Sequence, residues 1–212
     1  MDFAVYIGEE KTVIYKKNDG IVLNEPSLLA YRNAKLIAAG RSAASFEGES
    51  GVSVSPVVIH GVIQNVGDAS VFFRHISEKV GGMGSCVFCI SSSLTAGELN
   101  DFKTAIYSAG VGDAVFIPKV IAAAFENGYK FTNGEVLSVV IDGDFADMAV
   151  IKGFQIVDGG TLDDLSKLEE SKKRLIRKHQ EITQLTGDRM TVINGAGKLL
   201  STDFIKKIVK EN

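Results

Sequence analysis

Long apolar runs, proline and cysteine are all scarce in this chain of 212 residues. Its apolar runs reach only the length of strands, so no membrane-spanning helix is expected. With only 3 prolines, no proline-rich linker divides the chain. A net charge of −3 gives no reason to expect nucleic acid as a partner. The start, Met1-Asp2-Phe3, has no basic segment and leads directly into a predicted strand, which argues against a signal peptide.

Both cysteines lie in one short segment, Cys86-Val87-Phe88-Cys89. A C-x-x-C spacing can indicate a metal or redox site. Here the spacing lies inside an apolar run, and residues three apart on a strand point to opposite faces of the sheet. We therefore expect two buried structural thiols in a protein of the reducing cytoplasm.

One strand pattern occurs twice. Apolar, β-branched segments bounded by Gly and Asp predict three-stranded meanders, and Gly8 and Gly143 occupy equivalent places in them. The predicted strands span residues 3–7, 12–15 and 21–23 in the first copy, and 136–141, 147–151 and 154–157 in the second.

Strand and helix signals follow each meander. Asp68 can cap a helix over 69–80, and Thr95-x-x-Glu98 is a capping box. Thr161 is expected to cap a long polar helix over 162–185. The remaining predicted elements are strands at 37–40, 86–90, 114–117 and 190–193, helices at 120–126 and from Thr202, a loop over 42–55 and a turn at 194–197.

This order predicts an α/β fold made of a duplicated βββαβα unit with mixed sheets. The expected subdomains are residues 1–115, with a small insertion at about 24–56, and a shortened second one at 116–212. A duplicated βββαβα unit is the architecture of the actin and sugar-kinase superfamily, which holds nucleotide in the cleft between the halves.

Several strings, taken in order, resemble the bacterial actins of the MreB, rod-shape-determining family. They are Gly20–Ser27 after the first hairpin, Gly61–Ile63 ("DGVI"), Cys89–Thr95 ("VPSGVT"), Ile121–Ala124 ("PMAAAIG") and Asn194–Leu200 (the adenosine loop "TGGGALL"). The resemblance covers most of the chain and implies an actin-like fold.

The first phosphate loop of that family, D-x-G-T-x-x-T, corresponds here to residues 6–12. Tyr6 stands in place of the Asp that organises the metal. Glu9 stands in place of the Thr that bonds to phosphate, with Glu10 beside it.

The second loop, D-I-G-G-G-T-T, corresponds to residues 140–146, with Val140 in place of the metal-side Asp. Asp142 and Asp144 replace two glycines. Glycine lets backbone N–H groups approach phosphate, whereas carboxylates at that range repel it.

The segments that carry the family's other glutamates also depart from its pattern. The family's Glu-Glu-Pro before the Ala-rich helix is Pro118-Lys119-Val120 here. Glu98 falls where the family's water-activating Glu sits, but Leu99 follows it instead of Arg. The simpler interpretation of Glu98 is the capping box alone.

In bacterial actins a whole subdomain precedes the adenosine loop and walls the adenine pocket, whereas here only residues 158–189 fill that place. Their helix pattern predicts a narrow apolar seam with a basic run, 172–178, beside it. The helix is either a surface helix with a solvated basic face, or a contact for a partner helix or an acidic membrane. The seam is Leu165, Leu168, Lys172, Leu175, His179 and Ile182. Two other histidines, His60 and His75, are expected to lack companions that would form a metal site.

These departures predict a degenerate actin-like protein that is not an enzyme, with no catalytic, cofactor-binding or metal residues. It would act in the cytoplasm as a cytoskeletal or cell-shape scaffold or modulator, through a protein partner such as a bacterial actin filament or a second copy. Membrane contact would be possible only through the helix at about 162–185. One alternative is an active or weakly active nucleotide-binding ATPase with metal held by Asp142, Asp144 and Glu9. Another is a pseudo-chaperone or assembly factor on the same fold.

Overall fold

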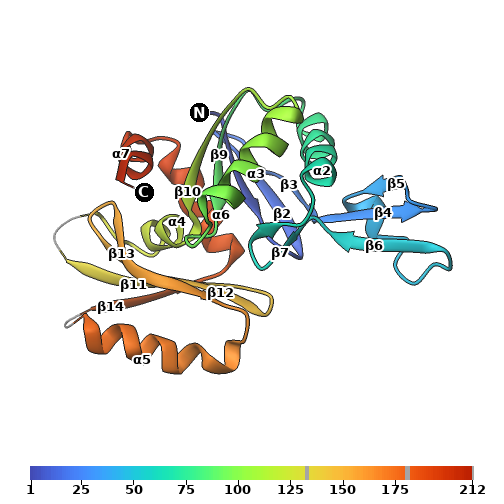
Figure 1. Cartoon of the computed structure of the whole chain (residues 1–212). Helices are drawn as coiled ribbons and strands as arrows, with labels where there is room; N and C mark the ends of the chain where they lie inside the picture. Colours follow the sequence, from blue (N-terminus) through green and yellow to red (C-terminus); the bar gives the residue numbers. More distant parts are fainter. Residues whose placement is uncertain (132–133, 180–181, 212) are drawn as a thin grey trace.

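Two mixed β-sheets organise the computed structural model, which describes residues 1–131, 134–179 and 182–211 (Figure 1). The first sheet has the order β10-β9-β1-β2-β3, with the strands β1 (Phe3–Ile7), β2 (Lys11–Lys16), β3 (Gly20–Pro26), β9 (Ser85–Ile90) and β10 (Asp113–Pro118). The second has the order β13-β12-β11-β14, with the strands β11 (Glu135–Asp142), β12 (Phe145–Lys152), β13 (Gln155–Leu162) and β14 (Thr183–Gly187).

The two sheets repeat one topology. In each, three antiparallel strands form a meander, and a later strand pairs in parallel with the first strand of that meander. The pairing between the second and third strands shifts register in both copies, at Ile14/Tyr15 and at Val150/Ile151. The α/β fold with mixed sheets is thus confirmed. The division at residues 115 and 116 stays a prediction, and β10 crosses that boundary.

Helices and sheets alternate in five layers (Figure 1). One face of the first sheet packs on α2 (Val66–Lys79) and α3 (Ala96–Ser108). Between the two sheets lie α4 (Lys119–Glu126) and α6 (Arg189–Leu199), and the outer face of the second sheet packs on α5 (Leu168–Lys178). The other helical elements are α1 (Arg41–Ala44), the 3-10 turn η1 (Leu165–Lys167) and α7 (Phe204–Glu211).

Alternation along the central strands explains these layers, because successive side chains point to opposite faces. Ala4 and Tyr6 of β1 face α4 and α6, while Phe3, Val5 and Ile7 face α2 and α3. On β9 the same alternation confirms that the two thiols point to opposite faces: Cys86 lies in the outer core and Cys89 in the core between the sheets. Burial raises the pKa of each thiol to about 12.

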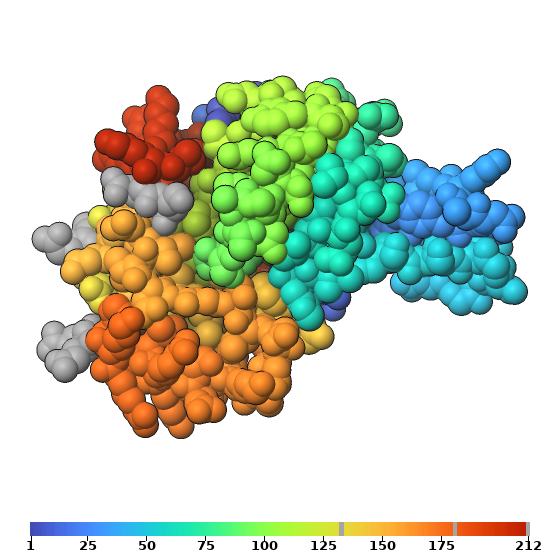
Figure 2. Space-filling model, in the orientation of Figure 1, coloured from blue at the N-terminus to red at the C-terminus, as the bar shows by residue number. Residues whose placement is uncertain are grey.

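A separate β-arm projects from the body of the molecule (Figures 1 and 2). Its sheet has the order β5-β4-β6, and a short hairpin of β7 and β8 follows it. The loop predicted over 42–55 is therefore only partly correct, since it includes most of α1 and all of β6 except Pro56. The arm and hairpin strands are β4 (Leu28–Arg32), β5 (Lys35–Ala39), β6 (Val52–Pro56), β7 (Val58–Ile59) and β8 (Val62–Ile63).

The segment from 158 to 200 differs most from expectation. The helix predicted over 162–185 is correct only in its middle, where α5 lies after the turn η1; its first residue ends β13 and its last residues belong to β14. Residues 180–181 of that range lie outside the described part. Residues 155–162 form an edge strand whose polar, glycine-containing stretch carries no apolar alternation.

The strand predicted at 190–193 and the turn at 194–197 are also wrong, because both lie inside α6. Gly195 is a packing glycine there: a side chain on it would collide with the carbonyl oxygen of Ala122 on α4. The cap of α2 is corrected as well, since Asn65 accepts the backbone N–H of Asp68 and the helix begins at Val66.

Among the residues described, no helix is both long and apolar enough to span a membrane.

Candidate functional site

The turn of the β1–β2 hairpin touches the end of β11 at the turn of the β11–β12 hairpin. A Cβ atom placed on Gly8 would lie 2.5 Å from Oδ2 of Asp142 and 2.9 Å from the ring of Tyr6. Only glycine leaves room for this approach. These are the two turns that the sequence resemblance matches to the family's phosphate loops.

A buried lysine lies between the two hairpins. Lys119, the first residue of α4, is 1% exposed, and its Nζ donates to Oδ2 of Asp142 at 3.3 Å. The same ammonium group lies 4.5 Å from the centre of the Tyr6 ring, within cation–π range. Burial, followed by the charge of Asp142, raises the pKa of Tyr6 well above its usual value, so the phenol stays neutral. Lysine, carboxylate and ring thus form a compact, buried unit between the two hairpin turns.

The first turn carries carboxylates nearer to solvent. Glu10 Oε2 accepts from Arg189 Nη1 at 2.9 Å, which joins this turn to the start of α6. Glu9 Oε2 accepts the backbone N–H of His60, in the β7–β8 turn, at 3.1 Å. On the facing turn, Asp144 Oδ1 lies 3.8 Å from Nε2 of His60.

The structure divides the three residues that the ATPase alternative brought together around one metal. Asp142 is buried and paired with Lys119, whereas Glu9 and Asp144 lie around His60. The expectation that His60 lacks companions is therefore wrong. No local pattern could have shown this group, since its three residues come from turns about 50 and 80 residues apart and meet only in the folded chain.

The other singled-out residues take structural positions. Glu98 accepts from both the backbone N–H and the hydroxyl of Thr95, which confirms the capping box, and the backbone bond lowers the pKa of Glu98. His75 bonds to the buried Glu25 at 2.9 Å. His179 lies between Glu135 and Asp158, at 2.9 and 3.2 Å.

A second link joins the first sheet to the second hairpin. Asp147 of β12 is 1% exposed and accepts the backbone N–H of Ser92 at 2.8 Å, and it also bonds to the hydroxyl of that serine. Burial raises the pKa of Asp147. The loop after β9 is thus held on β12 by a buried polar contact that sequence reasoning missed.

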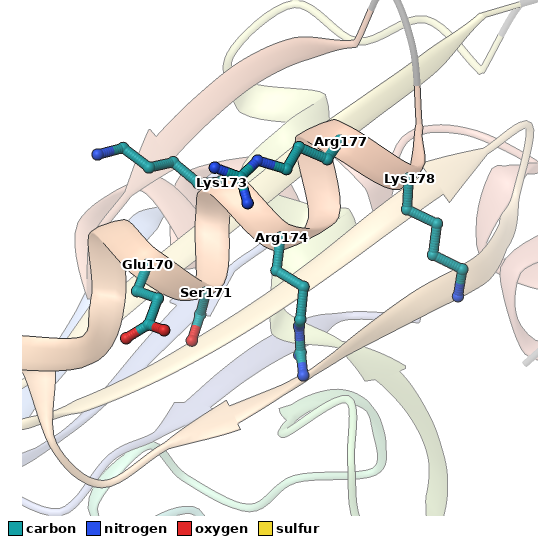
Figure 3. Close-up of a pocket in the computed structure, with 6 residues that line it drawn as sticks. All are labelled: Glu170, Ser171, Lys173, Arg174, Arg177 and Lys178. Carbon is teal, nitrogen blue, oxygen red and sulfur yellow. The ribbon is translucent and has the colours of Figure 1, made fainter.

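The basic residues of α5 form a separate surface on the outer helix (Figure 3). Leu175 is 2% exposed and packs on the second sheet, which leaves the charged residues on the outside. Lys178 pairs with Asp158 at 2.6 Å and Lys172 with Glu169 at 2.8 Å. A shallow hollow is lined by Glu170, Ser171, Lys173, Arg174, Arg177 and Lys178.

Comparison of the sequence with known proteins identifies a family and several relatives. The family described as MreB/Mbl protein matches residues 1–200. The chain is 28% identical over 174 residues to the cell shape-determining protein Mbl of Bacillus subtilis (strain 168), covering 76% of this chain and 51% of that protein. It is 26% identical over 165 residues to the cell shape-determining protein MreB of Escherichia coli (strain K12), covering 71% and 48%. The chain thus spans about half the length of the curated relatives it matches.

Solved structures show the same fold. The crystal structure of MreB5 of Spiroplasma citri bound to ADP matches with a TM-score of 0.68 at 21% identity, covering 93% of this chain and 60% of that one. A MamK double helical filament matches with a TM-score of 0.62 at 15% identity, covering 83% and 60%.

The repeated sheets and the facing hairpin turns define the class as bacterial actin-like proteins. Within this class, the chain belongs to the MreB/Mbl family. The resemblance inferred from the ordered strings is confirmed, although one of them, Asn194–Leu200, lies mostly within α6 rather than in a loop.

Proposed function

We propose that this protein is a cytoplasmic actin-like scaffold or modulator of cell shape that neither binds ATP tightly nor hydrolyses it. The observation that carries the proposal is the buried contact of Lys119 with Asp142 and Tyr6 between the two hairpins. It would act through protein contacts, with a bacterial actin filament or with further copies of itself.

The buried pair opposes nucleotide entry energetically. Seating a phosphate between the turns would require Asp142 to move away from Lys119. Separating a buried ion pair and leaving one charge without its partner costs about 3–5 kcal/mol. A nucleotide would have to supply that free energy before gaining any net affinity.

The carboxylates nearer to solvent add repulsion. Glu9 lies near Asp144 of the second turn, and Glu10 beside it is paired with Arg189. Two like charges about 4 Å apart repel by about 1 kcal/mol in water and by about 4 kcal/mol at an effective dielectric constant of 20. A polyphosphate placed here would meet several such charges.

Two exposed surfaces are available for protein contacts. The β-arm projects from the body, and Leu36 and Ile37 of its strand β5 are 40% and 39% exposed. The basic face of α5 presents Lys173, Arg174 and Arg177 to solvent and suits an acidic protein surface; it is also the surface that suits an acidic membrane (Figure 3). Among the structural neighbours, the MamK chain is described as part of a double helical filament, which supports assembly as the kind of function to test.

Calorimetry with Mg-ATP tests the loss of nucleotide chemistry. We expect no binding tighter than a dissociation constant of about 10 μM, which corresponds to about −7 kcal/mol. Tighter binding, or magnesium-dependent hydrolysis that disappears in Glu98→Ala, would overturn the proposal. Sedimentation of the protein, alone and with a bacterial actin of the same cell, tests the scaffold role, and the pelleted fraction should be the same with and without Mg-ATP.

The second candidate is a weakly active ATPase that holds its metal through Asp142, Asp144 and Glu9. The approach of Glu9 and Asp144 favours it, as do two structural neighbours described as bound to ADP and to AMPPNP. The Lys119 contact argues against it, because the carboxylate of Asp142, one of the three proposed ligands, is already paired with Lys119. If this candidate is correct, Mg-ATP binding should weaken in Asp142→Asn.

A further inference from the structure

The geometry points to a zinc site formed by Glu9, His60 and Asp144, which joins three turns of the chain. One ligand atom from each residue lies within 4.8 Å of the other two. The turns are those of the β1–β2, β7–β8 and β11–β12 hairpins. This site excludes Asp142 and needs no nucleotide, so its test can be read separately from that of the proposed function.

Two contacts position His60, one on its ring and one on its backbone. It stacks on Phe145 with ring centres 5.8 Å apart and planes within 5° of parallel. Its backbone N–H is bound by Oε2 of Glu9 at 3.1 Å. The stacked ring places Nε2 at 3.8 Å from Oδ1 of Asp144.

The separation of one pair of ligand atoms, those of His60 and Asp144, fits a bound ion better than a direct hydrogen bond. Nε2 of His60 and Oδ1 of Asp144 are 3.8 Å apart, which is too long for a hydrogen bond. Two ligands of a tetrahedral zinc ion, each about 2.1 Å from the metal, lie about 3.4 Å apart. A shift of a few tenths of an ångström would therefore bring this pair to zinc-binding distance. His60 and Asp144 have side chains that are 40% and 76% exposed, so solvent can deliver the ion.

The donor set selects the metal. An imidazole nitrogen with two carboxylates suits zinc, whereas magnesium and calcium prefer sites made only of oxygen. Three protein ligands leave a fourth position for water or for a group from a partner. A zinc ion here would also neutralise part of the negative charge that Glu9 and Asp144 place between the turns.

The test is calorimetric titration of the metal-free protein with zinc chloride near pH 7, followed by thermal unfolding with and without zinc. We expect one high-affinity zinc ion per chain, bound with a dissociation constant in the micromolar range, and a higher melting temperature when it is bound. Magnesium at the same concentration should produce neither effect. His60→Gln should weaken zinc binding at least tenfold.

The matched control is His75→Gln, which removes another partly buried histidine bonded to a carboxylate but distant from the site in sequence and contacts. It should bind zinc as the unmodified protein does. Because Gln at position 60 could disturb its turn, Asp144→Asn provides a second variant at an exposed position, with the same expected loss. Equal zinc binding by the unmodified protein and both site variants would overturn the inference, as would the absence of saturable binding. ATP binding is not measured in any of these arms, so the outcome is separate from that of the proposed function.

Discussion

The two hairpin turns occupy equivalent places in the two sheets but carry their charges differently. In the β11–β12 hairpin, Asp142 is 7% exposed in its side chain and is paired with Lys119, which is 2% exposed. In the β1–β2 turn, Glu10 is 58% exposed and is paired with Arg189, which is 31% exposed. The same topology thus carries one ion pair inside the molecule and one at its surface.

The difference indicates which contact holds the turns together. A surface pair contributes about 0–1 kcal/mol, because water screens the attraction. A buried pair adds little net stability when intact, but loss of one partner costs about 3–5 kcal/mol. We therefore expect the Lys119–Asp142 pair of the second hairpin, and not the Arg189–Glu10 pair of the first, to hold the two turns together.

The largest expected effect is that of Lys119→Met, which leaves Asp142 buried without its cation. Urea unfolding should show a loss of about 3–5 kcal/mol. The double variant Lys119→Met with Asp142→Leu should recover most of that loss, because neither charge remains. Lys198→Met is the control, since Lys198 pairs with Glu126 at 2.8 Å but is 61% exposed. A loss below about 1 kcal/mol in Lys119→Met would refute the importance of the buried pair.

Gly8→Ala should have the next largest effect, because its methyl group would press on the carboxylate of Asp142. The closest approach is 2.5 Å, so Asp142 must shift within its buried site. Overpacking of this kind costs about 1–3 kcal/mol, measured by thermal or urea unfolding. Gly84→Ala is the control, since a Cβ atom there would meet no other atom within 4 Å. Equal stability of the two variants would show that the turns can separate without cost.

Asp158 extends the comparison to a second pair near the surface. Its bond to Lys178, followed by that to His179, lowers the pKa of Asp158 to about 2. The folded-state pKa is below the unfolded value of about 3.9, so this contribution is present above about pH 4 and disappears as the pH falls toward 2. Lys178 is 68% exposed, so we expect about 0.5–1 kcal/mol after solvent screening.

The measurement for this pair is the difference in unfolding free energy between the unmodified protein and Asp158→Asn, followed from pH 7 to pH 2. The difference should vanish at the acid end. A difference that stays constant across this range would exclude the carboxylate charge as its source.

The smallest expected effect is that of Arg189→Gln. The Arg189–Glu10 pair is exposed, so its removal should change the unfolding free energy by less than about 1 kcal/mol. The change should shrink further in 1 M salt, where the screening length is about 3 Å. A larger, salt-independent change would show that the Arg189–Glu10 pair of the first turn, and not the buried pair, holds the turns together.

Sequence patterns were sufficient for the elements that carry their own local signals. The two meanders, the capping box at Thr95 and the opposed thiols of β9 follow from alternation and capping chemistry. The order of strings also identified the family.

Elements determined by tertiary contacts were not predictable in this way. The polar edge strand β13 is stabilised by pairing with β12, and Gly195 fits a close approach of α6 to α4 although it resembled a loop glycine. At the site, Lys119 and Asp142 are 23 residues apart, and no local periodicity links them. His60 joins Glu9 and Asp144 only because three hairpin turns converge.

Thermal unfolding with and without 1 mM Mg-ATP tests most directly whether the buried ion pair prevents tight nucleotide binding. A ligand present at about 100 times its dissociation constant stabilises the folded state by about 2.7 kcal/mol. For a domain of this size, that corresponds to a rise in melting temperature of about 5–10 °C if the dissociation constant were 10 μM. We expect a rise of less than about 5 °C, as for a dissociation constant weaker than about 10 μM, and a larger rise would contradict the account.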